Sequence, residues 1–299
     1  MDKNNSHMVG YGLAAASAIT FSAKGIFAKI LYGYGIDPIT LLALRFIIAM
    51  PFFWLTLWFY PSGKVDLRDM AVLVISGLLG LYGAALTDFY GLLYIDASLE
   101  RVILYTYPAI VVIWTYLFFK EKLGRRKLIS IGLTYVGLAF ALKIFSGGKG
   151  INFFGAGLVL FSAIIYSLSY IITEVLSRRV SGVKISAYTT TAAGFAFIGT
   201  WHGKYVPTDP HVWGLIFVLA VFSTYIPVLT LALGIKRIGA SRAALVSFIG
   251  PVSTAILAYV FLNETMELIQ IIGMGLVIIG VLVIYSEKNG KKGGEKAAI

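Results

Sequence analysis

Long apolar stretches, each close to the length of a membrane span, restrict most strongly how this chain can fold. A helix needs about 20 mostly apolar residues to cross the hydrocarbon core of a bilayer. Charged or Pro/Gly-marked breaks separate ten such stretches, at about residues 9–32, 38–60, 69–94, 97–119, 127–145, 153–176, 185–203, 211–234, 239–262 and 268–286. The sequence therefore predicts an all-α polytopic membrane protein with ten transmembrane helices.

The composition agrees with this class and excludes several others. Hydrophobic residues make up 59% of the 299 residues and charged residues only 13%, whereas a soluble domain carries about 25% charged residues. The chain has no Cys, and its three His residues, His7, His202 and His211, lack metal-ligand spacing. We therefore expect no metal and no cofactor. The loops are short, so function must lie in or between the spans.

The positions of Lys and Arg predict how the chain is oriented. With ten spans, both termini and alternate loops share one side, which carries 18 Lys and Arg residues against 4 on the other side. Because short cytoplasmic loops are rich in Lys and Arg, we expect both termini in the cytoplasm of a plasma (inner) membrane protein. The net charge of +11 is thus a topology signal, and no nucleic-acid partner is implied. The polar start MDKNNSHM does not predict a cleavable signal peptide.

The chain also repeats itself. At an offset of 143 residues, the matches include Thr87/Thr230, Ala97/Ala240, Ser98/Ser241, Pro108/Pro251, Glu121/Glu264, Gly132/Gly275 and Gly137/Gly280. Near the start of each half the offset is 145, with matches such as Gly12/Gly157 and Ser17/Ser162. Each repeat, at residues 9–145 and 153–286, holds five spans, and residues 287–299 form a basic cytoplasmic tail. Since five is odd, the second copy enters the membrane upside down, as in secondary transporters with a site between their halves.

Two copies of one motif carry a family resemblance. A Pro in the fourth span of each repeat, a Glu about thirteen residues later and Gly-Leu-x-x-x-Gly in the fifth span occur in YTYP…FFKEKL…IGLTYVG and FIGP…FLNETM…MGLVIIG. Together with DPITLLALRFIIAM, these motifs resemble the EamA-type family of the drug/metabolite transporter superfamily. The resemblance implies a ten-helix basket of two inverted five-helix repeats around a central cavity, and transport of small metabolites, often export of amino acids. The second repeat lacks counterparts of Lys24, Arg45 and Asp88.

Among the ionisable residues of the predicted spans, four qualify clearly as intramembrane groups: Lys24, Arg45, Asp88 and Glu174. Such a residue costs at least about 2.5–3.5 kcal/mol on insertion scales, so it normally faces protein or water. Lys24, Arg45 and Asp88 fall at similar depth in the outer half, which predicts an ion-pair cluster. That cluster is either a fixed contact that locks helices together or a gate or charge-selecting site. The first interpretation suits Arg45 better and the second Lys24, while Asp88 and Glu174 are the carboxylates best placed for proton coupling, if any exists.

Other polar side chains predict a cavity wall. In the sixth span, one helical face carries Ser162, Tyr166, Ser169, Tyr170 and Thr173, and the related face of the first span carries Ser17, Phe21, Lys24, Gly25 and Ala28. We expect both faces to line a substrate cavity, with close helix packing by small residues as the alternative. The mid-span residues Tyr82, Tyr105, Tyr107 and Tyr225 need hydrogen-bond partners. We expect them in the same wall, with lipid-facing or core packing as the alternative.

Proline and glutamate positions complete the set of candidates. Pro108 and Pro251 each remove a backbone hydrogen bond at matching positions, which predicts paired hinges in the fourth and ninth spans. Glu121 and Glu264 close these spans and suit a structural role at the start of the next helix.

The sequence favours a secondary transporter of small molecules, most plausibly an amino-acid or related-metabolite exporter that works by alternating access. No Walker A motif or clustered catalytic motif is present, so neither ATP-driven transport nor an enzyme is expected. A channel would show a repeated filter instead. Multidrug or cationic-compound efflux and transport of phosphorylated or other organic anions remain alternatives. The expected partners are a small-molecule substrate and the lipid bilayer.

Overall fold

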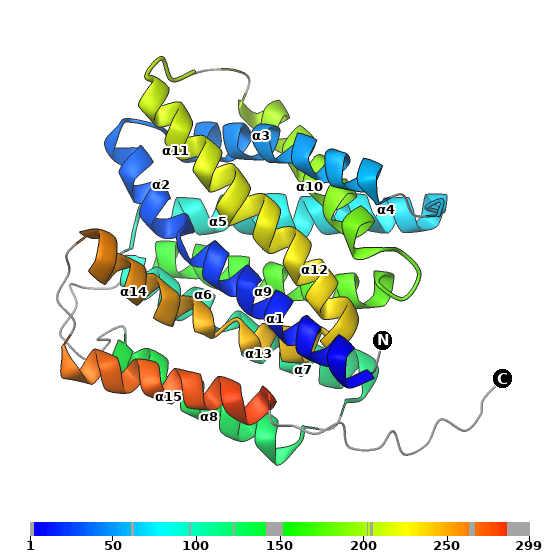
Figure 1. Ribbon diagram of the computed structural model, residues 1–299. Helices are drawn as coiled ribbons and strands as arrows, with labels where there is room; N and C mark the ends of the chain where they lie inside the picture. Colours follow the sequence, from blue (N-terminus) through cyan, green and yellow to red (C-terminus); the bar gives the residue numbers. More distant parts are fainter. Residues whose placement is uncertain are drawn as a thin grey trace.

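The computed structural model describes residues 3–60, 63–95, 97–121, 123–141, 152–201, 203, 206–262 and 267–285. In these ranges the regular structure is helical and contains no strand, as predicted (Figure 1). Glu264, the terminal tail 287–299 and the last residues of the predicted fifth span lie outside the described residues.

The helices of the first half are α1 (Lys3–Ser22), α2 (Lys24–Gly33), α3 (Pro38–Phe59), α4 (Leu67–Ser76), the π-helical segment η1 (Gly77–Gly83), α5 (Ala84–Gly91), α6 (Ala97–Leu104), α7 (Tyr107–Phe119) and α8 (Arg125–Ala141). Those of the second half are α9 (Phe153–Leu176), α10 (Gly182–Trp201), α11 (Pro210–Ala220), η2 (Val221–Tyr225, also π-helical), α12 (Ile226–Ile238), α13 (Ala240–Val246), α14 (Ile249–Leu262) and α15 (Leu268–Tyr285).

Each predicted span coincides with helical structure, but only some of the described helices meet the length and composition of a membrane span by themselves. Five do so: Ser6–Gly33, Pro38–Phe59, Leu67–Gly91, Phe153–Leu176 and Pro210–Ile238. The apolar helices Tyr107–Phe119 and Leu268–Ile284 are shorter. The ten-span count, the repeat boundaries and the orientation of the termini therefore stay predictions.

The outer surface of the bundle carries large apolar side chains. Trp58, Phe153, Phe195, Phe222 and Leu282 are all exposed, on helices from both halves of the chain. A soluble protein rarely exposes so much apolar surface, whereas the lipid-facing side of a membrane bundle requires it. This surface fits a multi-pass membrane protein.

The two halves share their irregularities. The π-helical segments η1 and η2 occupy equivalent places in the third and eighth predicted spans. The fourth and ninth are both broken, between α6 and α7 and between α13 and α14. Within the described ranges the first span departs from its partner, since α1 ends at Ser22 and α2 begins at Lys24, whereas α9 runs unbroken from Phe153 to Leu176.

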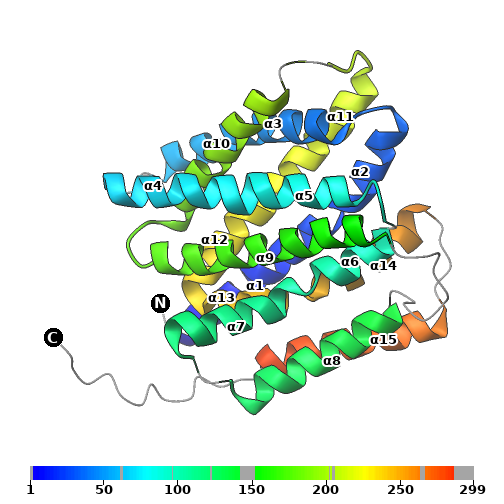
Figure 2. The same ribbon diagram turned by 180° about the vertical axis from the view of Figure 1, so that it is seen from behind.

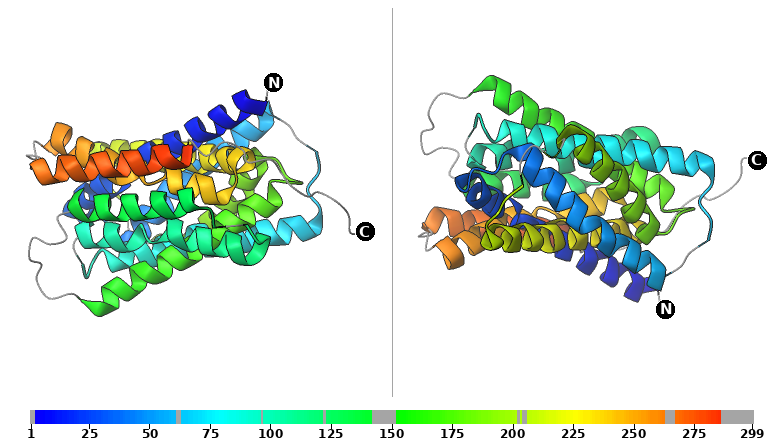
Figure 3. Two further views of the ribbon diagram at one scale, coloured as in Figure 1. Left: turned by 90° about the horizontal axis from the view of Figure 1, so that it is seen from below. Right: turned by 90° about the horizontal axis from the view of Figure 1, so that it is seen from above.

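Contacts between the halves follow the same symmetry. The most extensive packing joins α1 with α12, α5 with α9, α3 with α10, and α8 with α15. Under exchange of the halves, α1 with α12 becomes α9 with α5, and the other two pairs map onto themselves. The helices share one general direction, horizontal in Figure 3, and α8 and α15 lie side by side at the lower edge of the bundle (Figures 1 and 2).

Small residues bring α8 and α15 into backbone contact. A Cβ atom added at Gly137 on α8 would lie 2.6 Å from the Gly273 carbonyl oxygen and 2.8 Å from the Val277 nitrogen on α15. Such close approach is the usual way in which membrane helices gain dispersion energy, because apolar burial drives little association in lipid.

We therefore predict that Gly137→Ala lowers stability by about 1–3 kcal/mol, because the added methyl group must push the two backbones apart. The matched control is Gly132→Ala on the same helix, where an added Cβ meets nothing within 4 Å. Size-exclusion chromatography of the heated, detergent-solubilised protein gives the apparent melting temperature of each variant. Equal melting temperatures for the two variants would contradict the prediction.

Candidate functional site

A cavity of about 100 Å³ lies among helices of both halves. The first half contributes side chains from α1, α2, α3, α4, η1, α5 and the α6–α7 break, and the second from α9, α10, α12 and the α13–α14 break. Ser76, Thr173 and Ile185 line the cavity together with Lys24, Arg45 and Asp88.

The structure brings most of the predicted site residues to this cavity. Its wall includes Ser17, Lys24, Arg45, Asp88, Tyr105, Tyr107, Ser162, Tyr166, Ser169 and Tyr170. Tyr82, Tyr225, Glu174, Pro108 and Pro251 are not part of the wall.

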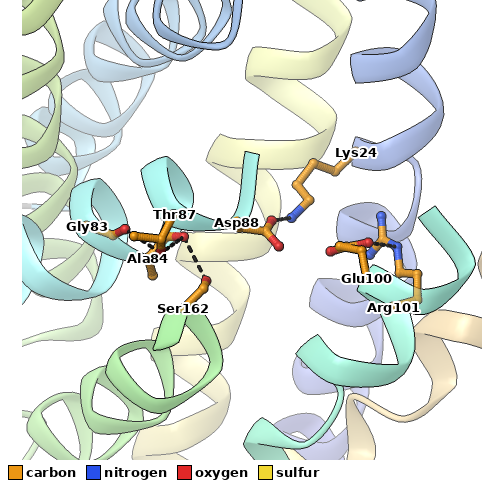
Figure 4. A network of polar contacts seen from close by, with 8 residues as sticks. All are labelled: Lys24, Gly83, Ala84, Thr87, Asp88, Glu100, Arg101 and Ser162. Atoms are coloured by element: carbon orange, nitrogen blue, oxygen red, sulfur yellow. Dashed lines mark hydrogen bonds and ion pairs between the residues drawn. The ribbon is translucent and has the colours of Figure 1, made fainter. Parts of the chain in front are cut away.

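Lys24 and Asp88 form an ion pair at the cavity wall. The helix break at Ala23 places Lys24 at the start of α2, and its Nζ lies 2.6 Å from Oδ2 of Asp88 on α5 (Figure 4). Both residues are almost fully buried. The Lys24 ammonium also lies 4.8 Å from the ring centre of Phe21 and 5.2 Å from that of Phe89. The pair is thus held among aromatic rings, away from bulk solvent, where an ion pair needs good geometry to persist.

Glu100 and Arg101 extend this charged cluster, and sequence reasoning missed them. Arg101 is one of the four Lys and Arg residues that the charge pattern assigns to the outer side, but it lies in α6 and is only 5% exposed. Its Nε is 3.3 Å from Oε2 of Glu100, which is 1% exposed and points toward Asp88 (Figure 4). Their position inside the predicted span 97–119 is the sequence feature that indicates burial, because a Glu-Arg pair in a span is as costly as the charges of Lys24, Arg45 and Asp88.

Arg45 faces the same cavity from α3 but has different partners. Its Nε donates a hydrogen bond of 2.5 Å to Oγ1 of Thr224 in η2. The guanidinium carbon lies 5.3 Å and 5.8 Å from the ring centres of Phe46 and Phe89. No hydrogen-bond partner is found for its buried Nη1.

A tyrosine cluster forms the wall beside these charges. The ring centre of Tyr107 lies 5.1 Å from that of Tyr166, 5.5 Å from that of Tyr170 and 5.9 Å from that of Tyr105. Tyr107 donates a hydrogen bond to Oγ of Ser247, and Tyr170 donates one of 3.3 Å to Tyr107. The cluster joins the α6–α7 break to α9 and to the α13–α14 break.

The serines of the predicted polar faces tie helices together. Ser17 Oγ on α1 donates to the Pro227 carbonyl oxygen at 2.9 Å, and Ser162 Oγ on α9 donates to that of Ala84 at 2.7 Å. The two bonds correspond under the repeat offsets. At these positions helix packing, the alternative interpretation, accounts for the hydroxyl groups. Ser169 Oγ bonds within its own helix, to the Tyr166 carbonyl oxygen at 2.6 Å.

Two predicted cavity tyrosines have partners elsewhere. The Tyr82 ring packs against Phe197, with ring centres 4.6 Å apart. The hydroxyl groups of Tyr225 and Thr56 share a hydrogen bond of 2.6 Å, and the Tyr225 ring packs against that of Phe53. Tyr225 and Thr56 also line a second groove, separate from the cavity. Core packing, the alternative interpretation, therefore describes them better.

The remaining candidates lie at helix ends. Oε2 of Glu174 accepts a 2.7 Å hydrogen bond from the backbone nitrogen of Ala240, the first residue of α13. A carboxylate there satisfies one of the free N–H groups of the helix start. Pro108 and Pro251 each lie in the first turn after a break, where a missing N–H costs least. Among the described residues, no three His, Asp or Glu side chains gather as metal ligands would.

Comparison with known proteins identifies the family. The model of the EamA-like transporter family matches residues 8–143 and again residues 153–286. The chain belongs to the EamA-like transporter family. It is therefore a membrane transporter with the two-repeat architecture of that family, and membership indicates transport rather than an enzymatic reaction.

Relatives and solved structures agree with this assignment. The chain is 32% identical over 293 residues to "Uncharacterized transporter YcbK" of Bacillus subtilis (strain 168), covering 92% of each chain. It is 27% identical to "Uncharacterized transporter YyaM" of the same organism, covering 93% of this chain and 92% of the relative. A crystal structure matches with a TM-score of 0.78 at 18% identity, over 94% of this chain and 96% of the other, which shows a shared fold.

The buried ion pair makes a stability prediction. Lys24→Met leaves Asp88 buried without its nearest cation and should cost about 3–5 kcal/mol. Adding Asp88→Leu should recover much of this loss, because two apolar side chains then replace the pair. The measurement is the apparent melting temperature of both single variants and the double variant in detergent. A double variant as unstable as the sum of the single changes would show that the two side chains do not interact.

Proposed function

We propose that this EamA-like transporter exports small amino acids or related metabolites by alternating access, with the cavity between the repeats as the substrate site. The observation that carries the proposal is a cavity whose wall joins buried charges to a tyrosine cluster. Lys24, Asp88 and Arg45 supply the charges and Tyr107 and Tyr166 belong to the cluster. A small zwitterion offers complementary charges, and ring faces suit its ammonium group.

The helix breaks support alternating access. Discontinuous helices at a repeat interface are the usual substrate sites of secondary transporters. In this chain the breaks before Tyr107 and before Ile249 occupy equivalent places in the two repeats and border the cavity. Pro108 and Pro251 follow these breaks, so each can act as a hinge at which the two segments of one span change their angle.

The proposal assigns the Lys24–Asp88 pair to closure of the cavity. The pair joins α2 to α5 at one part of the wall, and the repeat-related positions Ser169 and Leu231 carry no charge. Opening at that part of the cavity therefore differs chemically from opening at the other part. In the predicted orientation the pair lies on the outer side, where an exporter releases its substrate.

We predict that the purified protein in liposomes exchanges labelled small amino acids for unlabelled ones, and that Lys24→Ala slows this exchange at least about tenfold, as loss of a charged contact of about 1.4 kcal/mol or more would do. The assay is counterflow against a panel of amino acids, cationic drugs and organic anions. Arg179→Ala is the matched control, because Arg179 is exposed and pairs with Asp69, 3.1 Å away and outside the cavity.

Size-exclusion chromatography checks the folding of each variant before reconstitution. Wild-type exchange restricted to cationic drugs would replace the proposed cargo. Unchanged exchange by well-folded Lys24→Ala would remove Lys24 from the site.

A further inference from the structure

The buried guanidinium of Arg45 is the group from which a further property of the cavity follows. Arg45 is 4% exposed and lines the cavity from α3. Its Nε donates a hydrogen bond of 2.5 Å to Oγ1 of Thr224, but its buried Nη1 has no hydrogen-bond partner. A guanidinium stays protonated in proteins and presents a fork of donors that matches a carboxylate.

The charges around Arg45 do not balance. Lys24 is paired with Asp88 at 2.6 Å, and Arg101 with Glu100 at 3.3 Å. None of the ion pairs formed within the described part of the chain includes Arg45. Asp88 is close enough to interact electrostatically with Arg45, but its Oδ2 is already held by Lys24. Three buried cations therefore share two buried carboxylates, so positive charge is in excess even when both carboxylates are ionised.

An unmatched buried charge is costly unless a counter-charge reaches it. The second repeat supplies none, because none of its described residues that line the cavity is acidic. The neighbouring aromatic rings of Phe46 and Phe89 stabilise the guanidinium less than an anionic partner would. Arg45 lines the cavity, so a counter-charge that enters with the substrate can reach it.

We propose that Arg45 binds a carboxylate of the transported substrate and is the residue that selects for it. A carboxylate brings one negative charge, which reduces the excess. A phosphate monoester brings about 1.5 to 2 negative charges at pH 7, and a cationic compound increases the imbalance. The inference rests on the proposed function and deepens it, since it names the chemical group that the cavity recognises and moves the main recognition role from Lys24, which Asp88 neutralises, to Arg45.

The test compares acids with their neutral analogues. Thermal shifts of the detergent-solubilised full chain are titrated with L-alanine and L-alaninamide, L-serine and L-serinamide, and butyrate and butyramide. Wild type should bind at least one acid about tenfold or more tightly than its amide, because an amide cannot supply the charge-assisted bond. In Arg45→Gln this preference should disappear. Arg45→Lys should keep the preference for the acid with weaker binding, because an ammonium lacks the planar fork.

Arg179→Gln, which removes an exposed arginine outside the cavity, should match wild type. Equal binding of acids and amides by wild type overturns the inference while leaving amino-acid transport in place. Binding of butyrate but of no amino acid overturns the proposed cargo and supports the role of Arg45. Failure of every acid to stabilise wild type overturns the inference. If Arg45→Gln does not fold, Arg45→Lys decides, and an unchanged affinity for the acid in that variant also overturns it.

Discussion

The need to satisfy every backbone polar group inside the protein governs this fold. In a bilayer no water reaches a free N–H or C=O group, so a spanning helix can break only where neighbouring side chains supply partners. The breaks in this chain meet that condition. Ser22 Oγ donates to the Gly250 carbonyl oxygen at 2.9 Å, Thr254 Oγ1 donates to that of Ser22 at 3.3 Å, and the Tyr135 hydroxyl donates to that of Tyr105 at 2.9 Å. The breaks near Ala23, Thr106 and Ser247 thus support one another across the interior and border the cavity.

The two repeats share this scaffold but not its charges. The Ser17–Pro227 and Ser162–Ala84 bonds are equivalent, and so are the π-helical segments and the breaks of the fourth and ninth spans. By contrast, the positions equivalent to Lys24, Asp88, Glu100 and Arg101 are Ser169, Leu231, Ala243 and Ala244. The proposed alternating access needs equivalent geometry in the two repeats, so that two arrangements of similar energy exist, but it needs no equivalent charge. The charged side of the cavity is a feature of this chain's first repeat.

The sequence predicts the helical segments and part of the site, and the limits of that prediction have physical causes. Span length and apolar composition place the helices, and depth counting brings Lys24 and Asp88 together, because both depend only on position along a helix. Which side chains meet also depends on the direction that each one takes around its helix axis and on local breaks in the helices. The break at Ala23 has no Pro or Gly at its position, and Tyr82 and Tyr225 lie at suitable depth but on other faces. Glu100 and Arg101 stand near the start of the predicted span 97–119, where sequence position does not distinguish a buried charge from one at the membrane surface, and the structure buries both in α6.

The distribution of bond strengths also separates parts that can move from parts that stay together. The ion pairs Lys24–Asp88 and Glu100–Arg101 lie within the first repeat, where breaking a buried pair costs about 3–5 kcal/mol. At the cavity, the polar contacts between the repeats that are described above are hydrogen bonds: Ser17 and Ser22 make neutral ones, each worth about 1 kcal/mol, and the bond from Arg45 to Thr224, with its charged donor, is worth about 1.5–3 kcal/mol. The Arg179–Asp69 ion pair, which also joins the repeats, lies outside the cavity and has an exposed arginine. Relative movement of the repeats can therefore exchange weak hydrogen bonds without separating a buried ion pair. Arg45 is a charged group of the cavity wall that reaches across this boundary to Thr224, so a ligand at Arg45 acts where the two repeats meet.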